Sequence, residues 1–217
     1  MRLLNIKIIN HTLYKYVLVM LLLLGFVVEA KNNSLETQAT EQLNAILEKH
    51  GLVTNPKWHT VCLSLIEALS LNLFNECLVI DAKYPNAYSF ANGKVAITWG
   101  LLNQIRNNDQ LAHILAHEHA HLSLNHHQQV QNMLLNPPTF FTKSRFKRFH
   151  RKLEKEADEY AEQVLLAHQK DPLQIHHYLK RIEPWLDEVS QDHEKLKKRI
   201  QTEALPAEFT ETFWHND

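Results

Sequence analysis

The amino-acid sequence predicts one mainly helical α+β domain in which a small β-sheet or hairpin packs beside a central helix. Only four glycines occur in 217 residues, which disfavours a turn-rich all-β protein. Apolar residues recur at helical spacing in several segments, and the pair Asn92-Gly93 separates two short runs of β type. A chain of this length is long enough for one domain with a hydrophobic core and short for two, so residues 31–217 are expected to form a single domain.

Composition and charge are those of an ordinary globular protein. Apolar residues make up 45% of the chain and charged residues 22%. The formal net charge of −1 argues against a protein that binds nucleic acid through bulk electrostatics. A nucleic acid is therefore not among the expected partners.

The first thirty residues have the pattern of an export signal. Basic residues precede the unbroken apolar run Val17–Val28, and Val28-Glu29-Ala30 then offers small residues at the positions that signal peptidase recognises. This run is well short of the ~20 residues that a membrane-spanning helix needs. Residues 1–30 are expected to be a cleaved signal peptide, which would leave a periplasmic protein without an integral membrane span. An uncleaved N-terminal membrane anchor is the alternative.

The two cysteines of the chain, Cys62 and Cys77, are an even count in a protein that carries an export signal. We therefore expect a disulfide between them. Closure of this short loop would contribute about 3 kcal/mol to stability. Two buried free thiols are the alternative.

Local signals predict the elements of the N-terminal half. Apolar residues at helical spacing predict a helix over Ser34–His50 that ends at Gly51. Pro56 is placed to open a second helix. A short strand at Cys77–Ile80 follows.

Two further strands, Ala87–Phe90 and Lys94–Trp99, are expected on either side of the Asn92-Gly93 turn, before a short helix around Leu101–Arg106. A protease that cuts extended chain can hold it as an added strand along an exposed sheet edge. Val95–Thr98 is the candidate edge for a polypeptide substrate. A strand that only covers the core is the alternative.

The segment Asp109–His127 contains an H-E-x-x-H motif on a predicted helix, with Asp109 as the expected N-cap. His117 and His121 stand at i and i+4, so both imidazoles can bind one metal ion. Glu118 is turned by about 100° round the helix, which places it beside a metal-bound water instead of on the metal. A surface helix of solvated histidines, or a cluster that buffers metal ions, is the alternative.

Downstream, Arg151–Leu166 reads as an amphipathic helix on which Glu154 and Asp158 share one face. Like charges at this spacing repel, so a cationic partner is expected, and a divalent metal is one. A solvated helix rich in Glu and Lys is the alternative.

The remaining segments carry weaker signals. The run Thr139–Arg151 interleaves aromatic and basic residues and is expected to be a solvated loop, with a lid over a cleft or a face for nucleic acid or anionic membrane as alternatives. Pro172 is expected to start a further helix, and His193–Thr202 a last short one. The tail Glu203–Asp217 is expected to be peripheral.

Together these segments resemble the H-E-x-x-H zinc metallopeptidases that include HtpX, BepA and the CAAX prenyl protease. The resemblance covers about residues 35–200, and Arg151 falls where that family has an arginine before the downstream glutamate. Three positions depart from the family pattern: Asn92 replaces a glycine, Asn125 a frequent arginine, and Glu194 the proline after His193. The matching positions are Asn86-Ala87, Gly93, Gly100-Leu101-Leu102, Leu115-Ala116-His117-Glu118, His121 and Glu154 with Asp158.

The resemblance implies a zincin-like fold and assigns roles by matching position. His117, His121 and Glu154 would bind one Zn²⁺ per chain, the open tetrahedral set typical of catalytic zinc. Glu118 would be the general base and Asp158 would orient the site, with Arg151 nearby. His193 is the candidate donor to the oxyanion, and His113, His126 or a tyrosine are the alternatives.

The function that follows from the resemblance and the export signal is a zinc endopeptidase. It would act in protein quality control on unfolded or misassembled envelope proteins, with outer-membrane assembly components as candidate partners. A non-catalytic, zinc-dependent periplasmic chaperone or adaptor on the same scaffold is one alternative. A periplasmic metal-buffering protein that uses its many histidines is the other.

Overall fold

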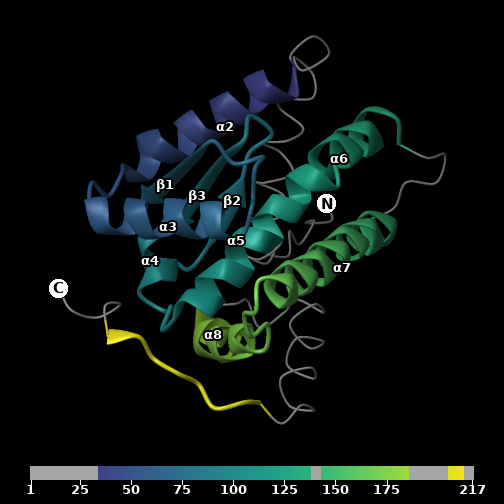
Figure 1. The fold of residues 1–217 in the computed structure, drawn as a ribbon. Coiled ribbons are helices and arrows are strands. Elements are labelled where there is room, and N and C mark those ends of the chain that lie inside the picture. The colour runs from purple at the N-terminus through teal and green to yellow at the C-terminus, as the bar shows by residue number, and fades with distance from the viewer. Residues whose placement is uncertain (1–33, 138–142, 186–204, 213–217) are drawn as a thin grey trace, which may run out of the picture.

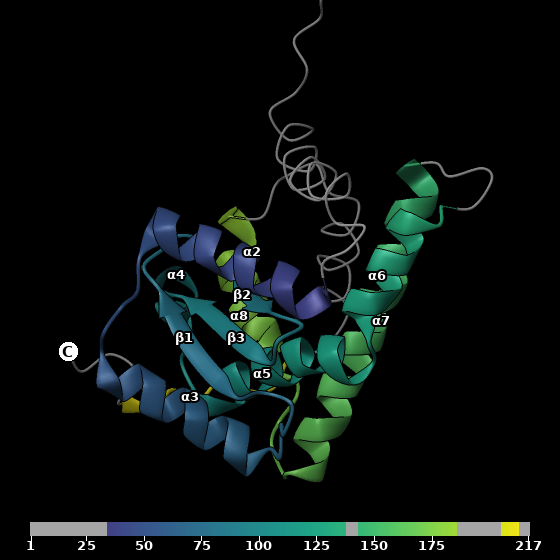
Figure 2. The ribbon, with the colours of Figure 1, turned by 90° about the horizontal axis from the view of Figure 1, so that it is seen from above.

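A three-stranded sheet lies between helices on both of its faces, and a long helical pair extends to one side (Figures 1 and 2). The structure, a computed structural model, describes residues 34–137, 143–185 and 205–212. The described elements, in chain order, are α2 (Leu35–His50), α3 (Pro56–Ala68), β1 (Glu76–Ile80), β2 (Ala87–Ser89), β3 (Lys94–Thr98), α4 (Trp99–Leu102), α5 (Asn108–Ser123), α6 (His126–Leu135), α7 (Lys143–Ala167), α8 (Gln174–Ile182) and the short 3₁₀ helix η1 (Glu183–Trp185).

The first two helices begin and end at the signals that predicted them. The Ser34 side chain caps α2 by accepting a hydrogen bond from the Thr37 amide, and Gly51 ends the helix with a φ of 77°. Pro56 is the first residue of α3, where its missing N–H costs nothing. These predictions are confirmed.

The sheet has the strand order β1-β3-β2, in which β3 runs parallel to β1 and antiparallel to β2. The Asn92-Gly93 hairpin is confirmed. Gly93 has a φ of 80°, and a Cβ added to it would lie only 2.7 Å from Asn75 Nδ2, so glycine suits this position. The prediction that Val95–Thr98 forms the sheet edge is wrong, because these residues lie in the central strand and all four are buried. A strand covered on both faces is expected to be continuously apolar, as Val95-Ala96-Ile97 is.

Alternate side chains of the strands enter two separate cores. Ala96 and Ile80 pack under α2, whereas Val95 and Ile97 face the larger core on the side of α3 and α5. Figure 2 shows α2 and α3 on opposite faces of the sheet. The larger core holds α5 in place, and α5 carries the H-E-x-x-H motif.

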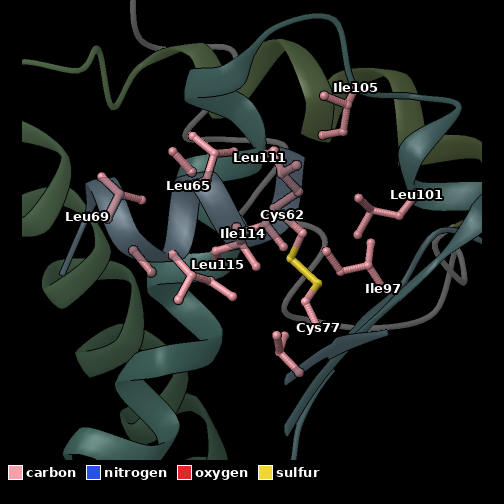
Figure 3. Close-up of a cluster of buried hydrophobic side chains, with 14 of the residues drawn as sticks. Cys62, Leu65, Leu69, Cys77, Ile97, Leu101, Ile105, Leu111, Ile114 and Leu115 are labelled. Carbon is pink, nitrogen blue, oxygen red and sulfur yellow. A yellow bond between two sulfur atoms is a disulfide. The ribbon is translucent and has the colours of Figure 1, made fainter. Parts of the chain in front are cut away.

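Cys62 of α3 and Cys77 of β1 form a disulfide inside the larger core, among the side chains of α3, α5 and the sheet (Figure 3). Both cysteines are almost fully buried. The bond ties α3 to the sheet beneath the helix that carries the motif.

Loss of this disulfide is expected to destabilise the fold. Because the bridge closes a loop with a sequence separation of 15, the double variant C62A/C77A should lose about 3 kcal/mol in the free energy of unfolding. Urea unfolding of the variant and of the oxidised wild type measures the difference. The exposed variant Leu166→Ala is the control, and equal midpoints for C62A/C77A and wild type would contradict the expectation.

The segment predicted as one helix is divided into α5 and α6. Asn125 between them adopts the left-handed conformation, with φ 55° and ψ 36°, which asparagine tolerates better than most residues. Asp109 is not the N-cap, because the Asn107 side chain accepts the capping hydrogen bond from the Gln110 amide. Asp109 instead accepts hydrogen bonds from Lys170 Nζ, at 2.8 Å, and from the Asp171 amide.

The predicted loop Thr139–Arg151 is helical from Lys143 onward, as the first part of α7. Lys and Arg are good helix formers, and the rings of Phe146 and His150, four residues apart, lie 4.4 Å from each other. The predicted helix Arg151–Leu166 is confirmed as the rest of α7. Residues 139–142 of this segment lie outside the described residues, so the alternative of a lid stays a prediction.

The tail is less peripheral than expected, because residues 205–212 cross the start of α5 and contact α8. Asn107 Nδ2 donates to the Phe209 carbonyl at 2.7 Å, and the Glu208 side chain accepts from Gln110 Nε2 at 2.8 Å. Glu208 also pairs with Arg181 of α8.

The predicted helix after Pro172 is confirmed as α8. The predicted signal peptide 1–30 and helix His193–Thr202 lie outside the described residues. Within the described ranges, no helix combines the length and the apolar character needed to span a bilayer.

Candidate metal centre

Three side chains from two helices converge on one point. His117 and His121 project from α5, and Glu154 projects from α7. The two histidine Nε2 atoms lie 3.3 Å apart, and Glu154 oxygens lie 3.4 Å from His117 Nε2 and 3.9 Å from His121 Nε2. Among the described residues, His117, His121 and Glu154 form the one group of at least three ligand side chains close enough to hold a metal ion.

Close packing of α5 against α7 brings these side chains together. The buried stripe of α7 consists of residues four positions apart, and two of them, Ala157 and Ala161, are small. Ala116 and Ala120 of α5 are also fully buried. Small residues on both helices allow the backbones to approach closely, so the short Asp158 side chain reaches His117 across the interface.

The donor set fits a divalent metal such as zinc. Tetrahedral zinc with bonds of about 2.0–2.1 Å places its ligand atoms about 3.3 Å apart. Two of the three observed separations are close to that value, and the third is longer. The histidines also present the correct nitrogens, because their Nδ1 atoms are already in hydrogen bonds and their Nε2 atoms face Glu154.

Each histidine is oriented by a partner behind it. His117 Nδ1 donates to Asp158 Oδ1 at 3.0 Å, and His121 Nδ1 lies 3.0 Å from Nδ1 of His126. His126 is itself buried, with its Nε2 3.5 Å from Glu156. Partners of this kind fix the ring orientation of metal-binding histidines.

The two histidines have opposite pKa shifts. Burial lowers the pKa of His117, but its hydrogen bonds to Asp158 and Glu154 outweigh burial and raise the pKa to about 10. Burial, together with the positive charge of His117, lowers the pKa of His121 to about 4. Burial acts to raise the pKa of Glu154, yet its hydrogen bond and charge interaction with His117 lower it. The imidazolium of His117 and the carboxylate of Glu154 therefore stabilise each other's charge.

Glu118 lies beside this group and contacts the sheet. Ser89 Oγ of β2 donates a hydrogen bond to Glu118 Oε2 at 2.9 Å. Burial raises the pKa of the Glu118 carboxyl, although the charge of His117 and the Ser89 hydrogen bond oppose that rise. A half-buried carboxyl with a raised pKa is suited to take up a proton and to give it back.

Sequence reasoning missed Ser89, and it did not single out His126 from the other histidines near the motif as the partner of His121. Ser89 stands at the end of β2, two residues from Ala87, so it points to the same face of the sheet as Ala87, which packs against the larger core. This alternation was the signal that could have found it. His126 carried no such signal, because its position depends on the turn at Asn125.

Other residues singled out in the sequence have different positions. His119 points away from the site, where its Nδ1 lies 2.9 Å from the Tyr160 hydroxyl and its Nε2 accepts from the Leu73 amide. His113 is buried in α5, and Arg151 lies on α7 three residues before Glu154. His193 lies outside the described residues, so the structure does not place it.

A cleft of about 260 Å³ opens next to His121 and Glu154. Its walls come mainly from α2, α6 and α7, and three more histidines, His126, His127 and His150, also line it. A substrate that reached the candidate metal ligands from this side would lie against these three helices.

The fold is mainly helical with a small sheet, and two histidines of the H-E-x-x-H helix meet a glutamate from a second helix. These are the features of a zincin-like domain. The family model of peptidase family M48 matches residues 53–145. The segment 53–145 is thus similar to peptidase family M48, in agreement with the resemblance drawn from the sequence.

The matched segment contains His117, Glu118 and His121, and it ends before Glu154. Peptidases of this family are metal-dependent hydrolases that require zinc. No curated protein matches the chain.

Proposed function

We propose that this chain is a zinc endopeptidase that hydrolyses peptide bonds of unfolded or misassembled proteins of the bacterial envelope. The observation that carries the proposal is the convergence of two Nε2 atoms and a carboxylate beside the Glu118 side chain. The compartment rests on the export signal in residues 1–30 and the substrate class on the family resemblance.

His117, His121 and Glu154 would hold one Zn²⁺ per chain. When bound, the ion would supply Lewis-acid polarisation of the substrate carbonyl and of the attacking water. Glu118 takes the proton of that water and delivers it to the leaving amine.

Neighbouring residues keep these groups in position. Ser89 orients the Glu118 carboxylate by donating to Oε2, and Asp158 orients the His117 ring by accepting from Nδ1. His193 stays our proposed donor to the oxyanion. Of the alternatives, His126 already has its Nδ1 beside His121 and its Nε2 beside Glu156.

The strand β2 replaces Val95–Thr98 as the edge that would hold an extended substrate. Among the described strands, β2 pairs on one side only, with β3. Its last residue, Ser89, contacts Glu118 directly. A peptide added along β2 would therefore pass beside the proposed base.

Zinc binding is expected to release a proton from His117. Because the pKa of this histidine is raised to about 10, the metal must displace its proton throughout the neutral range, whereas His121, with its pKa lowered to about 4, is already neutral. The apparent zinc affinity of the zinc-free protein should therefore increase about tenfold per pH unit between about pH 6 and pH 9. Competition against a chromophoric chelator measures this slope.

Calorimetry in two buffers of different ionisation enthalpy counts the released protons and provides the control. An affinity that does not change across this pH range would contradict the proposed protonation of His117.

The proposed activity is tested with an unfolded and a folded substrate. The zinc-loaded protein should generate new N-termini from casein, detected by mass spectrometry, and none from a compact disulfide-bonded protein. A metal chelator should stop the reaction. Suppression of casein aggregation without new N-termini would favour a chaperone or adaptor instead of a peptidase.

A further inference from the structure

The cleft beside the candidate metal centre has three walls of different origin. Residues of α2 form one wall, α6 forms the second, and the turn of α7 that ends at Glu154 forms the third. His121 and Glu154 lie among the lining residues, so the cleft is continuous with the metal centre. The wall formed by α2 lies outside the segment that matches the family.

Apolar atoms form most of the exposed lining surface, although eight of the fifteen lining residues are histidine, glutamine or glutamate. Apart from the histidines, Glu154 is the one described lining residue with a formal charge. The other polar lining residues are glutamines of α2 and α6. The apolar lining residues are Leu35, Ala39, Ala91, Val130, Leu134, Leu135 and Leu153. The half-exposed or exposed leucines of α6 face this cleft, although leucine normally gains by burial.

The size of the cleft suits one large apolar side chain. A closed apolar cavity of about 150 Å³ holds a benzene molecule. The cleft volume of about 260 Å³ exceeds that value. A leucine, methionine or phenylalanine side chain therefore fits, and it would cover leucines that are now open to water.

We infer that this cleft is a specificity subsite that takes a large apolar side chain of a residue next to the scissile bond. The inference rests on the proposed peptidase function and adds the class of sequence at which the enzyme cuts. Such side chains are accessible in unfolded chains and covered in folded ones. The subsite would thereby restrict cleavage to polypeptides that have lost their fold.

The charges around the cleft favour the same occupant. An Asp or Glu side chain would lose hydration among apolar walls and would lie close to Glu154. A Lys side chain would gain from Glu154 only if that carboxylate were not committed to the metal ion. The expected order of preference is therefore Leu, Met and Phe over Ala, with Asp the least favoured.

The test uses peptides that differ at one residue on either side of a single scissile bond, with Leu, Phe, Ala, Lys or Asp at that position. For the zinc-loaded wild type, we expect kcat/KM for Leu to exceed that for Ala about 10- to 100-fold. Val130→Phe fills the cleft from the α6 side and should reverse this preference. Leu134→Ala widens the cleft and should reduce the ratio of Leu to Ala about tenfold.

The control variant is Leu166→Ala, which changes an exposed leucine of α7 that does not line the cleft and should leave the ratio unchanged. Circular dichroism and zinc content show whether Val130→Phe is folded. If it is not, Leu134→Ala carries the test alone.

Binding to the inactive variant Glu118→Gln separates the subsite from the chemistry. Fluorescence anisotropy with the same peptides should show tighter binding of Leu than of Ala, and Val130→Phe in this background should remove the difference. That result supports the subsite even if the wild type cleaves no peptide, in which case the proposed function alone fails. Cleavage with a preference for Lys, or with equal rates for Leu and Ala, would overturn the subsite.

Discussion

Glu118→Gln is expected to bind one zinc ion and to lose casein cleavage by a factor of about 10²–10⁴. The glutamine amide keeps the shape of the side chain, and its oxygen can still accept the hydrogen bond that Ser89 donates to Glu118. What it loses is the ability to take a proton from water and to return it to the amine. The ligand group His117, His121 and Glu154 does not include Glu118, so the zinc content should not change.

The measurement pairs metal analysis with a cleavage rate for each protein. Glu162→Gln is the matched control, because it makes the same change at an exposed position of α7 and should behave as wild type. Equal cleavage by Glu118→Gln and wild type would end the mechanism proposed for this site. Loss of zinc from Glu118→Gln would instead assign this residue to the metal.

Glu154→Ala is expected to lower zinc affinity by more than about 10²-fold and to abolish cleavage as a result. Loss of a supporting partner already weakens metal binding about 10- to 100-fold, and Glu154 is a proposed ligand. Its removal leaves two imidazoles as the remaining ligands of the site. A zinc titration of the metal-free variant measures the loss.

Two other glutamates of α7 serve as comparisons. Glu159 forms an exposed pair with Lys155 at 3.0 Å, so Glu159→Ala should bind zinc as the wild type does. Glu156 lies beside His126, and Glu156→Ala should have a smaller effect than Glu154→Ala. Loss of zinc from Glu156→Ala, with normal binding by Glu154→Ala, would exchange the two assignments.

Features that depend on a few neighbouring residues were predicted from the sequence. Ser34 and Gly51 bound α2, Pro56 opens α3, and Asn92-Gly93 forms the hairpin turn, because capping and turn geometry are local. The i, i+4 spacing of His117 and His121 is local in the same sense. The position of Glu154 depends on how α7 packs on α5, and there the family resemblance supplied what spacing alone could not.

The errors concern features that tertiary structure decides. The order of strands depends on β1 pairing with β3 across the chain, so the strand closest in sequence to the metal helix is central and not an edge. The break at Asn125 occurs in a segment without glycine or proline, and it places His126 behind His121. The charges of Lys143–Arg151 suggested a loop, although these residues are good helix formers that extend α7.

The contacts of the C-terminal segment 205–212 also could not be predicted, because tertiary structure decides them. Residues 205–212 gave no periodic pattern, yet they pack on α5 and α8 through specific side-chain contacts of Asn107, Gln110 and Arg181. The contacts of Asn107 and Gln110 join residues about a hundred positions apart. They leave no trace in either segment taken alone.

The most direct test of the central claim is a titration of the metal-free wild type with zinc while casein cleavage is followed. A single site formed by His117, His121 and Glu154 predicts no cleavage without metal, a linear increase up to one equivalent of zinc, and no further increase beyond it. Cleavage that persists in the metal-free protein, or zinc uptake of several equivalents without any cleavage, would contradict a zinc peptidase with this centre.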